Sequence, residues 1–304
     1  DHRDLHSFPT RRSSDLPICP GGLSSCRPIE APRPACHHGR QYRLNPRSPL
    51  PRRVALSILR SIGATPDLLP HLPELLLNVP HLGGAPHTVL KLVSDAGIGR
   101  GSTVLELACG KGTLALSIAE SRGCNVTACD AFPPFLDEAK DCANRRGLSA
   151  RCRFLPMDLS ATGPLPFENF DAAIMIGLWP FDRAIRALRK TVSPGGIYIV
   201  DDAVLIDAAG DDADRAESAS AESVRRFVRR QGDELLSLRP VPASEARTLQ
   251  TYLLKQLRLN ARQLGRRHPS INATLTAFIQ RQHLAFGRLQ GPLRPHVLCC
   301  RRRS

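Results

Sequence analysis

The stretch Thr103-Val-Leu-Glu-Leu-Ala-Cys-Gly-Lys-Gly-Thr-Leu-Ala115 decides the fold. Its first part, Val104 to Ala108, is an apolar run with one acid inside it and is typical of a buried parallel strand. The run breaks at Gly110 and Gly112, and Leu114 to Ala119 then has the spacing of a helix. A strand that turns through glycines into a helix presents free N–H groups and a positive dipole end. Because glycines let a ligand lie against the main chain, the turn predicts a site for a nucleotide-like cofactor.

The glycine spacing alone leaves two kinds of cofactor open. Gly110-x-Gly112-x-x-Ala115 also fits the dinucleotide fingerprint, with Asp130 at about the expected distance downstream. Glu106, however, is a carboxylate inside the strand, where it can face the ammonium group of an amino-acid-bearing cofactor. A dinucleotide turn has no use for a buried acid there. Glu106 therefore favours a cofactor that carries an amino acid.

Four further segments predict strands of the same sheet. They are Asn125–Asp130, Cys152–Asp158, Phe170–Ile176 and Val192–Val200. The second ends in an acid that is placed to meet an adenine amino group, and the last is entered through a Pro-Gly-Gly turn. The ordered set is more specific than any one of its members.

Taken in order, these segments resemble the class I S-adenosylmethionine-dependent methyltransferases over roughly residues 85 to 205. The resemblance implies a Rossmann-like, doubly wound α/β sheet of about seven strands with helices on both faces. It also implies that the protein is an enzyme and that S-adenosyl-L-methionine is its cofactor.

The resemblance further implies which residues hold that cofactor. Glu106 and the two glycines match the loop under its methionine part, Asp130 matches the acid that grips both ribose hydroxyls, and Met157 with Asp158 matches the adenine-binding step. Ala108 departs from the pattern, because a glycine is commonest there, but one methyl group is a small perturbation. The expected cofactor residues are Glu106, Ala108, Cys109, Gly110, Gly112, Asp130, Ala131, Met157, Asp158 and Ile176.

Several of these residues also have ordinary structural interpretations. The two glycines can serve only a tight strand–helix turn. Asp130 can cap the helix expected over Pro133–Asn144, and Asp158 can be a plain loop acid. Cys109 fits packing as a small apolar residue better than a reactive role.

The front of the chain calls for a separate interpretation. Residues 6–16 resemble the in-frame translation of a sequencing-adapter oligonucleotide, so we leave residues 1–16 out of fold reasoning. Residues 17–50 are rich in Pro, Arg and Ser without apolar periodicity and are expected to be disordered. Cys19, Cys26 and Cys36-His37-His38 lack a paired C-x-x-C knuckle, so no metal site is expected.

Composition limits the remaining possibilities. A chain of 304 residues with 42% hydrophobic content has room for one domain of about 250 residues with an ample core. No run approaches the ~18 apolar residues of a membrane span, so no membrane partner is expected. Ten cysteines without a framework of spacings indicate free thiols in a reducing cytosol, and hence a cytoplasmic protein.

The net charge of +14 allows a nucleic-acid partner but does not favour one. Residues 54–205 are almost neutral, and much of the excess lies in doublets such as Arg225-Arg-Phe-Val-Arg-Arg230 and in Arg301–Arg303. Doublets separated by apolar residues are typical of the solvated rim of amphipathic helices. One Trp and three Tyr also offer few platforms for stacking bases.

The coarse pattern divides the chain into four parts. They are a tail over 1–50, leader helices over 51–96, a cofactor-binding core over 97–205, and helices with closing strands over 206–304. The leader helices are expected at Arg53–Ile62, Pro70–Leu77 and Pro86–Ala96, and a core helix at Asp182–Thr191.

The last part begins with an acidic link, Asp207 to Glu217. After it the pattern predicts, in order, a helix over Ser220–Gln231, a strand over Glu234–Pro240, helices over Glu245–Arg266 and Ile271–Leu289, and a strand over Pro295–Arg302. The two long helices are either an insertion between the last strands or a C-terminal helical subdomain. In both cases they can form a lid over the substrate cleft.

The implied cofactor sets the chemistry that is expected. Its methyl group is already activated, so the protein mainly has to align a nucleophile and exclude water. If a general base is needed, the candidates are Asp201, Asp202 and His283, each of which also has a plain structural interpretation. Trp179 follows the fourth strand and is a candidate for lining the substrate pocket or for packing in the core.

The expected acceptor is a small molecule, methylated by direct in-line displacement. After the fourth strand the chain reads Ile176-Gly-Leu-Trp-Pro180, without the Asn or Asp before Pro-Pro-aromatic of base-amino methyltransferases and without a Pro-Cys nucleophile. The alternatives are an RNA or protein methyltransferase and a non-catalytic S-adenosylmethionine-binding protein.

Overall fold

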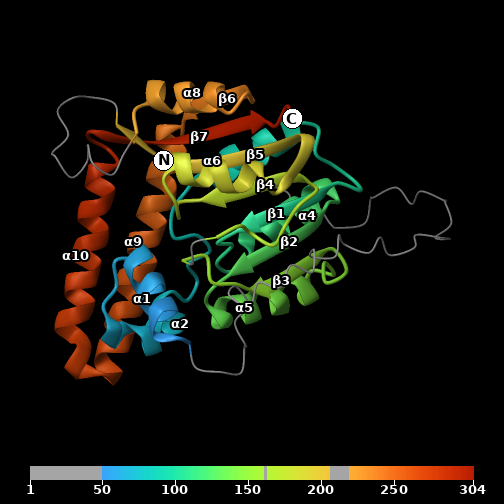
Figure 1. Ribbon diagram of the computed structural model, residues 1–304. Helices are drawn as coiled ribbons and strands as arrows, with labels where there is room; N and C mark the ends of the chain where they lie inside the picture. The colour runs from blue at the N-terminus through green and yellow to red at the C-terminus, as the bar shows by residue number, and fades with distance from the viewer. Residues whose placement is uncertain (1–49, 161–162, 206–218) are drawn as a thin grey trace, which may run out of the picture. The chain divides into compact units, whose positions relative to one another are not determined.

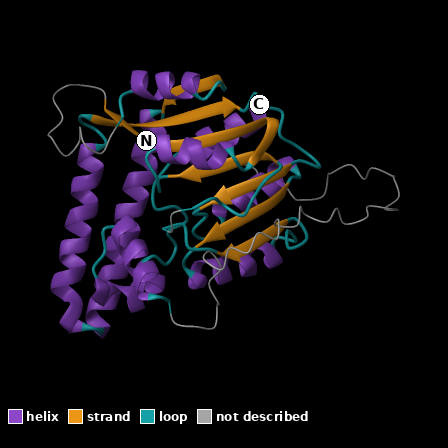
Figure 2. Cartoon of the chain, viewed as in Figure 1, coloured by secondary structure: helices purple, strands orange, loops and turns teal. Residues whose placement is uncertain are grey.

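Seven strands form one mixed sheet in the computed structural model, which describes residues 50–160, 163–205 and 219–304 (Figure 1, Figure 2). The strands lie in the order β3-β2-β1-β4-β5-β7-β6. Neighbours from β3 to β5 are parallel, whereas β7 is antiparallel to both of its neighbours. In chain order the strands are β1 (Thr103–Leu107), β2 (Asn125–Asp130), β3 (Cys152–Pro156), β4 (Phe170–Ile176), β5 (Val192–Leu205), β6 (Glu234–Pro240) and β7 (Leu293–Arg301). The predicted α/β sheet is confirmed.

The strand order reverses at β1. From β1 the chain moves outward to β2 and β3, and then returns to place β4 on the other side of β1. The carboxyl ends of β1 and β4 therefore flank the topological switch point, where open α/β sheets bind ligands. The glycine-containing turn that follows Leu107 lies there.

Helices cover both faces of the sheet, as strands that are apolar on both sides require. One face packs against α3 (Pro86–Asp95), α4 (Thr113–Arg122) and α5 (Pro133–Arg145), and the other against α6 (Phe181–Arg189) and α8 (Ala221–Arg230). Alternate residues of a strand serve the two layers: Val104 packs on the α3–α5 side and Leu105 on the α6–α8 side. Burying each such aliphatic side chain stabilises the fold by about 1.5–3 kcal/mol.

A third apolar cluster joins the remaining helices, which we call the helical lid. The lid consists of α1 (Arg52–Ser61), η1 (Pro66–His71), α2 (Leu72–Leu75), α9 (Ala243–Arg267), η2 (Pro269–Ile271) and α10 (Asn272–Arg288). Leu68 and Leu72 from its first half pack in the same cluster as Leu253 and Phe278 from its second half. Phe135, at the start of α5, belongs to this cluster too, so the lid packs against the carboxyl edge of the sheet.

The two long lid helices, α9 and α10, lie side by side between β6 and β7 in the chain (Figure 1). Of the two arrangements that the sequence left open, the structure therefore shows the insertion between the last strands. Because β7 returns from α10 to pair with β5 and β6, the insertion is anchored to the sheet at both ends.

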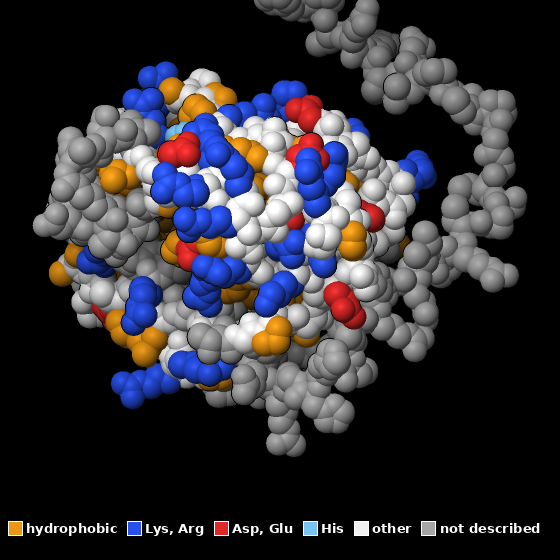
Figure 3. Space-filling model, turned by 45° about the horizontal axis from the view of Figure 1, so that its top comes forward, with side chains coloured by type: hydrophobic (Ala, Val, Ile, Leu, Met, Phe, Trp, Pro, Cys, Tyr) orange, Lys and Arg blue, Asp and Glu red, His pale blue; other side chains and the backbone are white. Residues whose placement is uncertain are grey.

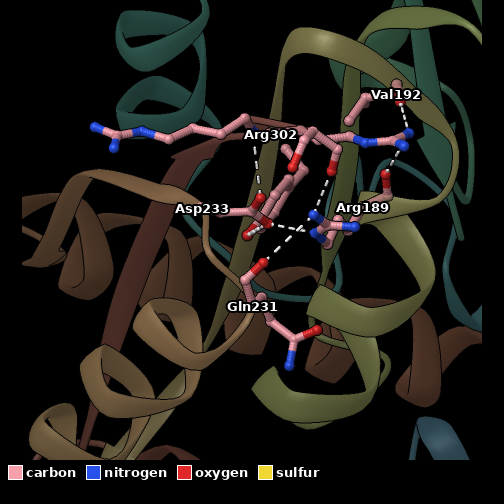
Figure 4. Close-up of polar contacts among 8 residues, drawn as sticks. Arg189, Val192, Gln231, Asp233 and Arg302 are labelled. Carbon is pink, nitrogen blue, oxygen red and sulfur yellow. Dashed lines mark hydrogen bonds and ion pairs between the residues drawn. The ribbon is translucent and has the colours of Figure 1, made fainter.

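A buried polar cluster ties the opposite, amino-terminal edge of β5 and β6 together (Figure 4). The carboxylate of Asp233 accepts hydrogen bonds from Nε of Arg189, at 2.8 Å, and from the hydroxyl of Tyr198, at 2.9 Å. Arg302 donates to the carbonyl oxygen of Val192, at 2.7 Å. A buried carboxylate with these donors is satisfied, and the cluster lies at the edge away from the glycine turn. We assign it a structural role.

Two local predictions differ from the structure. The helix expected over Pro70–Leu77 is a 3₁₀ turn, η1, followed by four α-helical residues, because Pro70 and Pro73 lack N–H donors. α2 ends at Leu75, and Asn78 in the turn that follows has a left-handed φ of 58°, so no helix continues to Leu77 and beyond. The turn expected ahead of Ile197 lies within β5, where Val192 already pairs with Phe170 and the register shifts.

Some predictions fall outside the described residues. These are the adapter-like segment 6–16, the tail expected to be disordered over 17–50 apart from its last residue, the Cys and His residues between 19 and 38, and the acidic link over 207–217. All described elements belong to one compact unit of residues 32–304. None of the helices in the described ranges combines the length and the apolarity needed to cross a bilayer.

Candidate active site

The glycine loop, residues 108–112, turns sharply at the end of β1. Ala108, Gly110 and Gly112 have φ values of 57°, 54° and 68°, all in the left-handed region. The two glycines have distinct reasons to be there. A Cβ on Gly112 would lie 2.5 Å from Cε1 of Phe154, so close packing requires this glycine. A Cβ on Gly110 would meet no atom within 4 Å, so this glycine leaves open space above the loop.

Asp130 holds the glycine loop in place from the end of β2. One carboxylate oxygen accepts the backbone N–H of Gly110, at 2.8 Å, and the other accepts that of Phe132, at 2.9 Å. Burial raises the pKa of this carboxyl, and the N–H bonds, including one from Ala131, oppose the rise. Phe132 is the N-cap of α5, and its own side chain accepts no capping bond. Asp130 therefore holds both the glycine loop and the residue at the start of α5.

Glu106 is a buried carboxyl on β1, below the start of α4. Its side chain is 4% exposed, and burial raises its pKa to about 8, although the backbone N–H of Ala115 partly opposes the rise. Within the described part of the chain, its Oε2 has no hydrogen-bond partner. A buried polar atom without a partner costs about 1–3 kcal/mol, so it marks a place where a donor is missing.

Asp158 lies just past the end of β3, next to Met157, and is 1% exposed. Its Oδ1 accepts the N–H of Ser160, at 2.9 Å, and its Oδ2 forms a 2.9 Å ion pair with Arg53 of α1. The N–H of Met157 donates to the carbonyl oxygen of Asp130, at 2.8 Å, which sets the ends of β2 and β3 together. Arg53 therefore connects the lid to Asp158, the residue expected to bind the adenine of the cofactor.

The other expected cofactor residues surround the same edge. Cys109 is buried, donates its N–H to the carbonyl oxygen of Cys129, at 3.0 Å, and packs in the apolar cluster of α3–α5. Burial raises the pKa of its thiol well above the usual range, which fits packing rather than reactivity. Ala131 follows Asp130, and Ile176 ends β4; both are half-buried.

Asp201 and Asp202 point to opposite sides of the sheet, because successive strand residues alternate. Asp201 faces α3, where its Oδ2 accepts the N–H of Ala85 at 2.5 Å. Asp202 pairs in register with His296 of β7, on the side of α8. Burial raises the pKa of Asp201 to about 7 and that of Asp202 to about 6. The structure thus separates two residues that are neighbours in the chain.

A tight turn at Gly83–Gly84 brings the segment ahead of α3 onto the end of β4. A Cβ on Gly84, whose φ is +80°, would lie 2.2 Å from Cγ2 of Ile176 and 3.1 Å from Oδ2 of Asp201. The turn therefore lies directly on both residues. His81, two residues before the turn, is half-buried, and this desolvation lowers its pKa to about 4 and leaves its imidazole neutral at pH 7.

His283 and Trp179 have different surroundings. His283 is exposed on α10, and no hydrogen bond or ion pair joins its side chain to another described residue. Trp179 is buried against the α6–α8 layer, with the guanidinium of Arg183 stacked 4.1 Å from its ring centroid. This placement shows that Trp179 packs in the core, and its contact with a substrate stays a prediction.

Sequence reasoning missed Arg53 and Glu245. Glu245, in the first turn of α9, accepts the N–H of His87 at 2.9 Å and the hydroxyl of Thr88 at 2.6 Å. It thereby binds the positive N-terminus of α3. The partners are more than 150 positions apart in the chain, and no local pattern marks such a pair.

The comparisons with known proteins agree with this geometry. Residues 104–196 match the family model described as a methyltransferase domain. Over 167 residues, the chain is 29% identical to the ubiquinone/menaquinone biosynthesis C-methyltransferase UbiE of Azotobacter vinelandii, a match that covers 52% of this chain and 62% of that protein. The chain spans about half to three-fifths of the length of the curated relatives it matches, 48% and 62% in the first two.

Solved structures share the fold at low sequence identity. A methyltransferase from Thiobacillus denitrificans, solved with S-adenosyl-L-homocysteine, has a TM-score of 0.62 and 17% identity, over 76% of this chain and 98% of that one. The [4+2]-cyclase SpnF has a TM-score of 0.61 and 22% identity, over 84% of this chain and 97% of that one. Residues 104–196 therefore carry a methyltransferase domain, and the solved structures share the class I fold, which confirms the predicted resemblance.

Proposed function

We propose that this protein transfers a methyl group from S-adenosylmethionine to a small-molecule acceptor under the helical lid. The observation that carries the proposal is the convergence of three acids. Glu106 on β1, Asp130 at the end of β2 and Asp158 after β3 lie on three adjacent parallel strands, around a loop with open space above Gly110.

The hydrogen-bonding groups around the loop fit this cofactor. The unpartnered Oε2 of Glu106 suits the ammonium group of a methionine moiety. Asp130 would hold the ribose hydroxyls with the lone pairs that Gly110 and Phe132 leave free. Asp158 would accept from the adenine amino group. The loop N–H groups and the start of α4 would lie under the methionine part.

When bound, the cofactor supplies a methyl group that a sulfonium has already activated. The task left to the chain is to orient the acceptor and exclude water, which is worth ~7–11 kcal/mol of the barrier in well-oriented reactions. The Gly83–Gly84 turn lies on the end of β4, and the lid packs on the carboxyl edge. Both are therefore placed to enclose an acceptor at the switch point.

Asp201 is our candidate for a general base. It lies beneath the Gly83–Gly84 turn, and its pKa of about 7 suits proton transfer near neutral pH. Asp202 points to the α8 side of the sheet, and His283 is exposed on α10. If the acceptor carries a proton that must leave, Asp201 would take it.

A small acceptor is supported by the lid and by the names of related proteins. Among solved structures of the same fold are a coclaurine N-methyltransferase bound to N-methylheliamine and a phosphoethanolamine N-methyltransferase from Haemonchus contortus. We propose that residues 97–205 hold the cofactor, that 51–96 and 206–304 supply the acceptor pocket, and that the protein works in the cytoplasm. The free cysteines of the described residues suit a reducing compartment.

The test has two steps on the purified full chain. Calorimetry with S-adenosylhomocysteine should give a saturable binding signal; its absence would overturn the cofactor site. Labelled S-adenosylmethionine is then incubated with a metabolite extract, with total RNA and with total protein. Label should pass to the metabolite fraction alone, and transfer mainly to RNA or protein would replace the small-molecule acceptor.

A second candidate is a protein that binds the cofactor without transferring its methyl group. The [4+2]-cyclase SpnF shares this fold, and fold alone does not fix the reaction. Binding of S-adenosylhomocysteine without label transfer to any pool would favour it. An RNA acceptor would use the exposed arginines of α6 and α8, such as Arg186 and Arg226. Figure 3 shows one face of the molecule with many Lys and Arg side chains.

A further inference from the structure

The segment that leaves α2, residues 75–80, is held by side chains at almost every carbonyl. It precedes the Gly83–Gly84 turn and belongs to no helix or strand beyond Leu75. Its bonds are Asn260 Nδ2 to Leu75 O at 3.0 Å and to Leu77 O at 2.7 Å, Lys111 Nζ to Leu76 O at 2.8 Å, Tyr252 Oη to Asn78 O at 3.0 Å, and Thr113 Oγ1 to Pro80 O at 3.1 Å. We call this segment the strap.

The donors come from two separate parts of the molecule. Asn260 and Tyr252 belong to α9, in the lid. Lys111 belongs to the glycine loop, and Thr113 is the first residue of α4, which follows that loop. The strap therefore connects the lid with the loop that would lie under the cofactor.

Lys111 is the unusual member of this set. It stands between the two loop glycines but is only 8% exposed. Its ammonium donates to the strap, forms a 2.8 Å ion pair with Glu138 of α5, and lies 5.6 Å from the ring centroid of Phe135. A buried ammonium needs such partners, because leaving it unpaired is strongly destabilising. Its charge is committed to the strap and to α5.

The strap continues along the chain into the Gly83–Gly84 turn. A few residues after Pro80, the turn at Gly84 lies on Ile176 and Asp201, the candidate acceptor side of the site. A shift of the glycine loop would move Lys111, and with it the carbonyl of Leu76. The strap thus gives the loop a direct mechanical connection to the acceptor side.

We propose that Lys111 is a positioning residue that couples cofactor binding at the glycine loop to ordering of residues 75–85 over the acceptor. This inference rests on the proposed cofactor site. An ordered glycine loop fixes Lys111, Lys111 fixes the strap, and the strap sets the Gly83–Gly84 turn. Coupling between two sites of this kind typically amounts to a 5–150-fold change.

Hydrogen exchange tests the coupling without relying on turnover. In the native protein, S-adenosylhomocysteine should slow amide exchange in residues 75–85 by about fivefold or more. In Lys111→Met, calorimetry should still detect cofactor binding, but this slowing should fall below about twofold. Lys111→Arg, which keeps a cation and donors, should restore it. Lys140→Met, at a half-exposed lysine paired with Asp137 on α5, is the matched control and should behave as native.

Kinetics gives a second readout. Lys111→Met should raise the KM for the acceptor and lower kcat, with a smaller change in cofactor Kd. If Lys111→Met fails to fold, Thr113→Ala combined with Tyr252→Phe removes two hydrogen bonds to the strap without changing a buried charge. This double variant should also reduce the slowing of amide exchange that S-adenosylhomocysteine causes in residues 75–85.

The outcomes separate this inference from the proposed function. No binding of S-adenosylhomocysteine to the native protein would overturn both. Binding that leaves exchange in residues 75–85 unchanged, or full protection in the variants, would overturn the coupling and leave the cofactor site intact.

Discussion

The carboxylate of Asp130 accepts the backbone N–H of Gly110, 2.8 Å away, so the end of β2 holds the loop that follows β1. The acid expected to bind the ribose therefore also shapes the loop expected to lie under the methionine. A loop that is already held needs less ordering when a ligand binds, and lower ordering cost favours affinity.

Replacing Asp130 should weaken cofactor binding strongly. If Asp130 binds the ribose as proposed, Asp130→Ala removes two charge-assisted hydrogen bonds to it, worth ~1.5–3 kcal/mol each, as well as the support of Gly110. Calorimetry with S-adenosylhomocysteine should show at least about a tenfold rise in Kd. Asp137→Ala, at an exposed acid on α5, is the matched control. An unchanged Kd in Asp130→Ala would remove this residue from the site.

Glu106 should release a proton when the cofactor binds. Its pKa of about 8 keeps the carboxyl protonated at pH 7 in the free protein, and a nearby ammonium would favour the ionised form. Calorimetry at pH 7 in buffers of different ionisation enthalpy should report release of up to about one proton. Glu106→Gln should release none. Equal release by both proteins would show that the ammonium group binds elsewhere.

Asp201 and Asp202 should differ in their effect on turnover. If Asp201 is the base, kcat/KM of the native protein rises with pH through about 7, as its carboxyl ionises. Asp201→Asn should lower kcat by about 10²-fold or more and remove that rise. Asp202→Asn, on the other side of the sheet, should change kcat by less than about tenfold. Similar losses in both variants would indicate a shared structural effect.

Asp201 should also shape the pH dependence of stability. Its folded-state pKa of about 7 lies above the ordinary 3.8, so the folded state binds more protons in that window. Stability is therefore lost as pH rises from about 4 to 7. Asp201→Asn lacks this loss, and its free energy of unfolding at pH 8 relative to pH 4 should exceed the native difference by about 4 kcal/mol. Denaturant unfolding at both pH values measures it.

Gly84 and Gly83 form a matched pair for testing the turn on the acceptor side. A Cβ at Gly84 meets Ile176 at 2.2 Å and sits on a left-handed backbone, whereas a Cβ at Gly83 meets nothing within 4 Å. Gly84→Ala should destabilise the fold by about 1–3 kcal/mol and raise the KM for the acceptor. Gly83→Ala should leave both within error. If Gly84→Ala is equally harmless, the turn does not lie on the end of β4 in solution.

Much of the fold can be read from local sequence. The strands at Asn125–Asp130, Phe170–Ile176 and Glu234–Pro240 have the predicted limits, because apolar runs between turn residues are local signals. The limits of α2 were less predictable, since Pro70 and Pro73 divide that segment into two kinds of helix. β7 lies between β5 and β6 because it pairs with strands that are distant in the sequence, and no local pattern predicts such pairing.

Part of the candidate site could likewise be predicted from local sequence, and part could not. The glycine loop and the acids at the ends of β1 to β3 follow from motif spacing, so the structure brings together residues that the sequence had already selected. The ion pair of Arg53 with Asp158 and the bonds of Glu245 to α3 join segments more than 100 residues apart. Strand alternation, once β5 is known, is what separates Asp201 from Asp202.

The place of β7 has a consequence for how the chain acquires its structure during synthesis. Because β7 lies between β5 and β6, those two strands have no shared partner until the chain has been made beyond Leu293. Until then the growing polypeptide presents an open, apolar strand edge at β5, which is a template for aggregation. We therefore expect the ribosome-bound nascent chain to depend on chaperones more than its compact final form suggests.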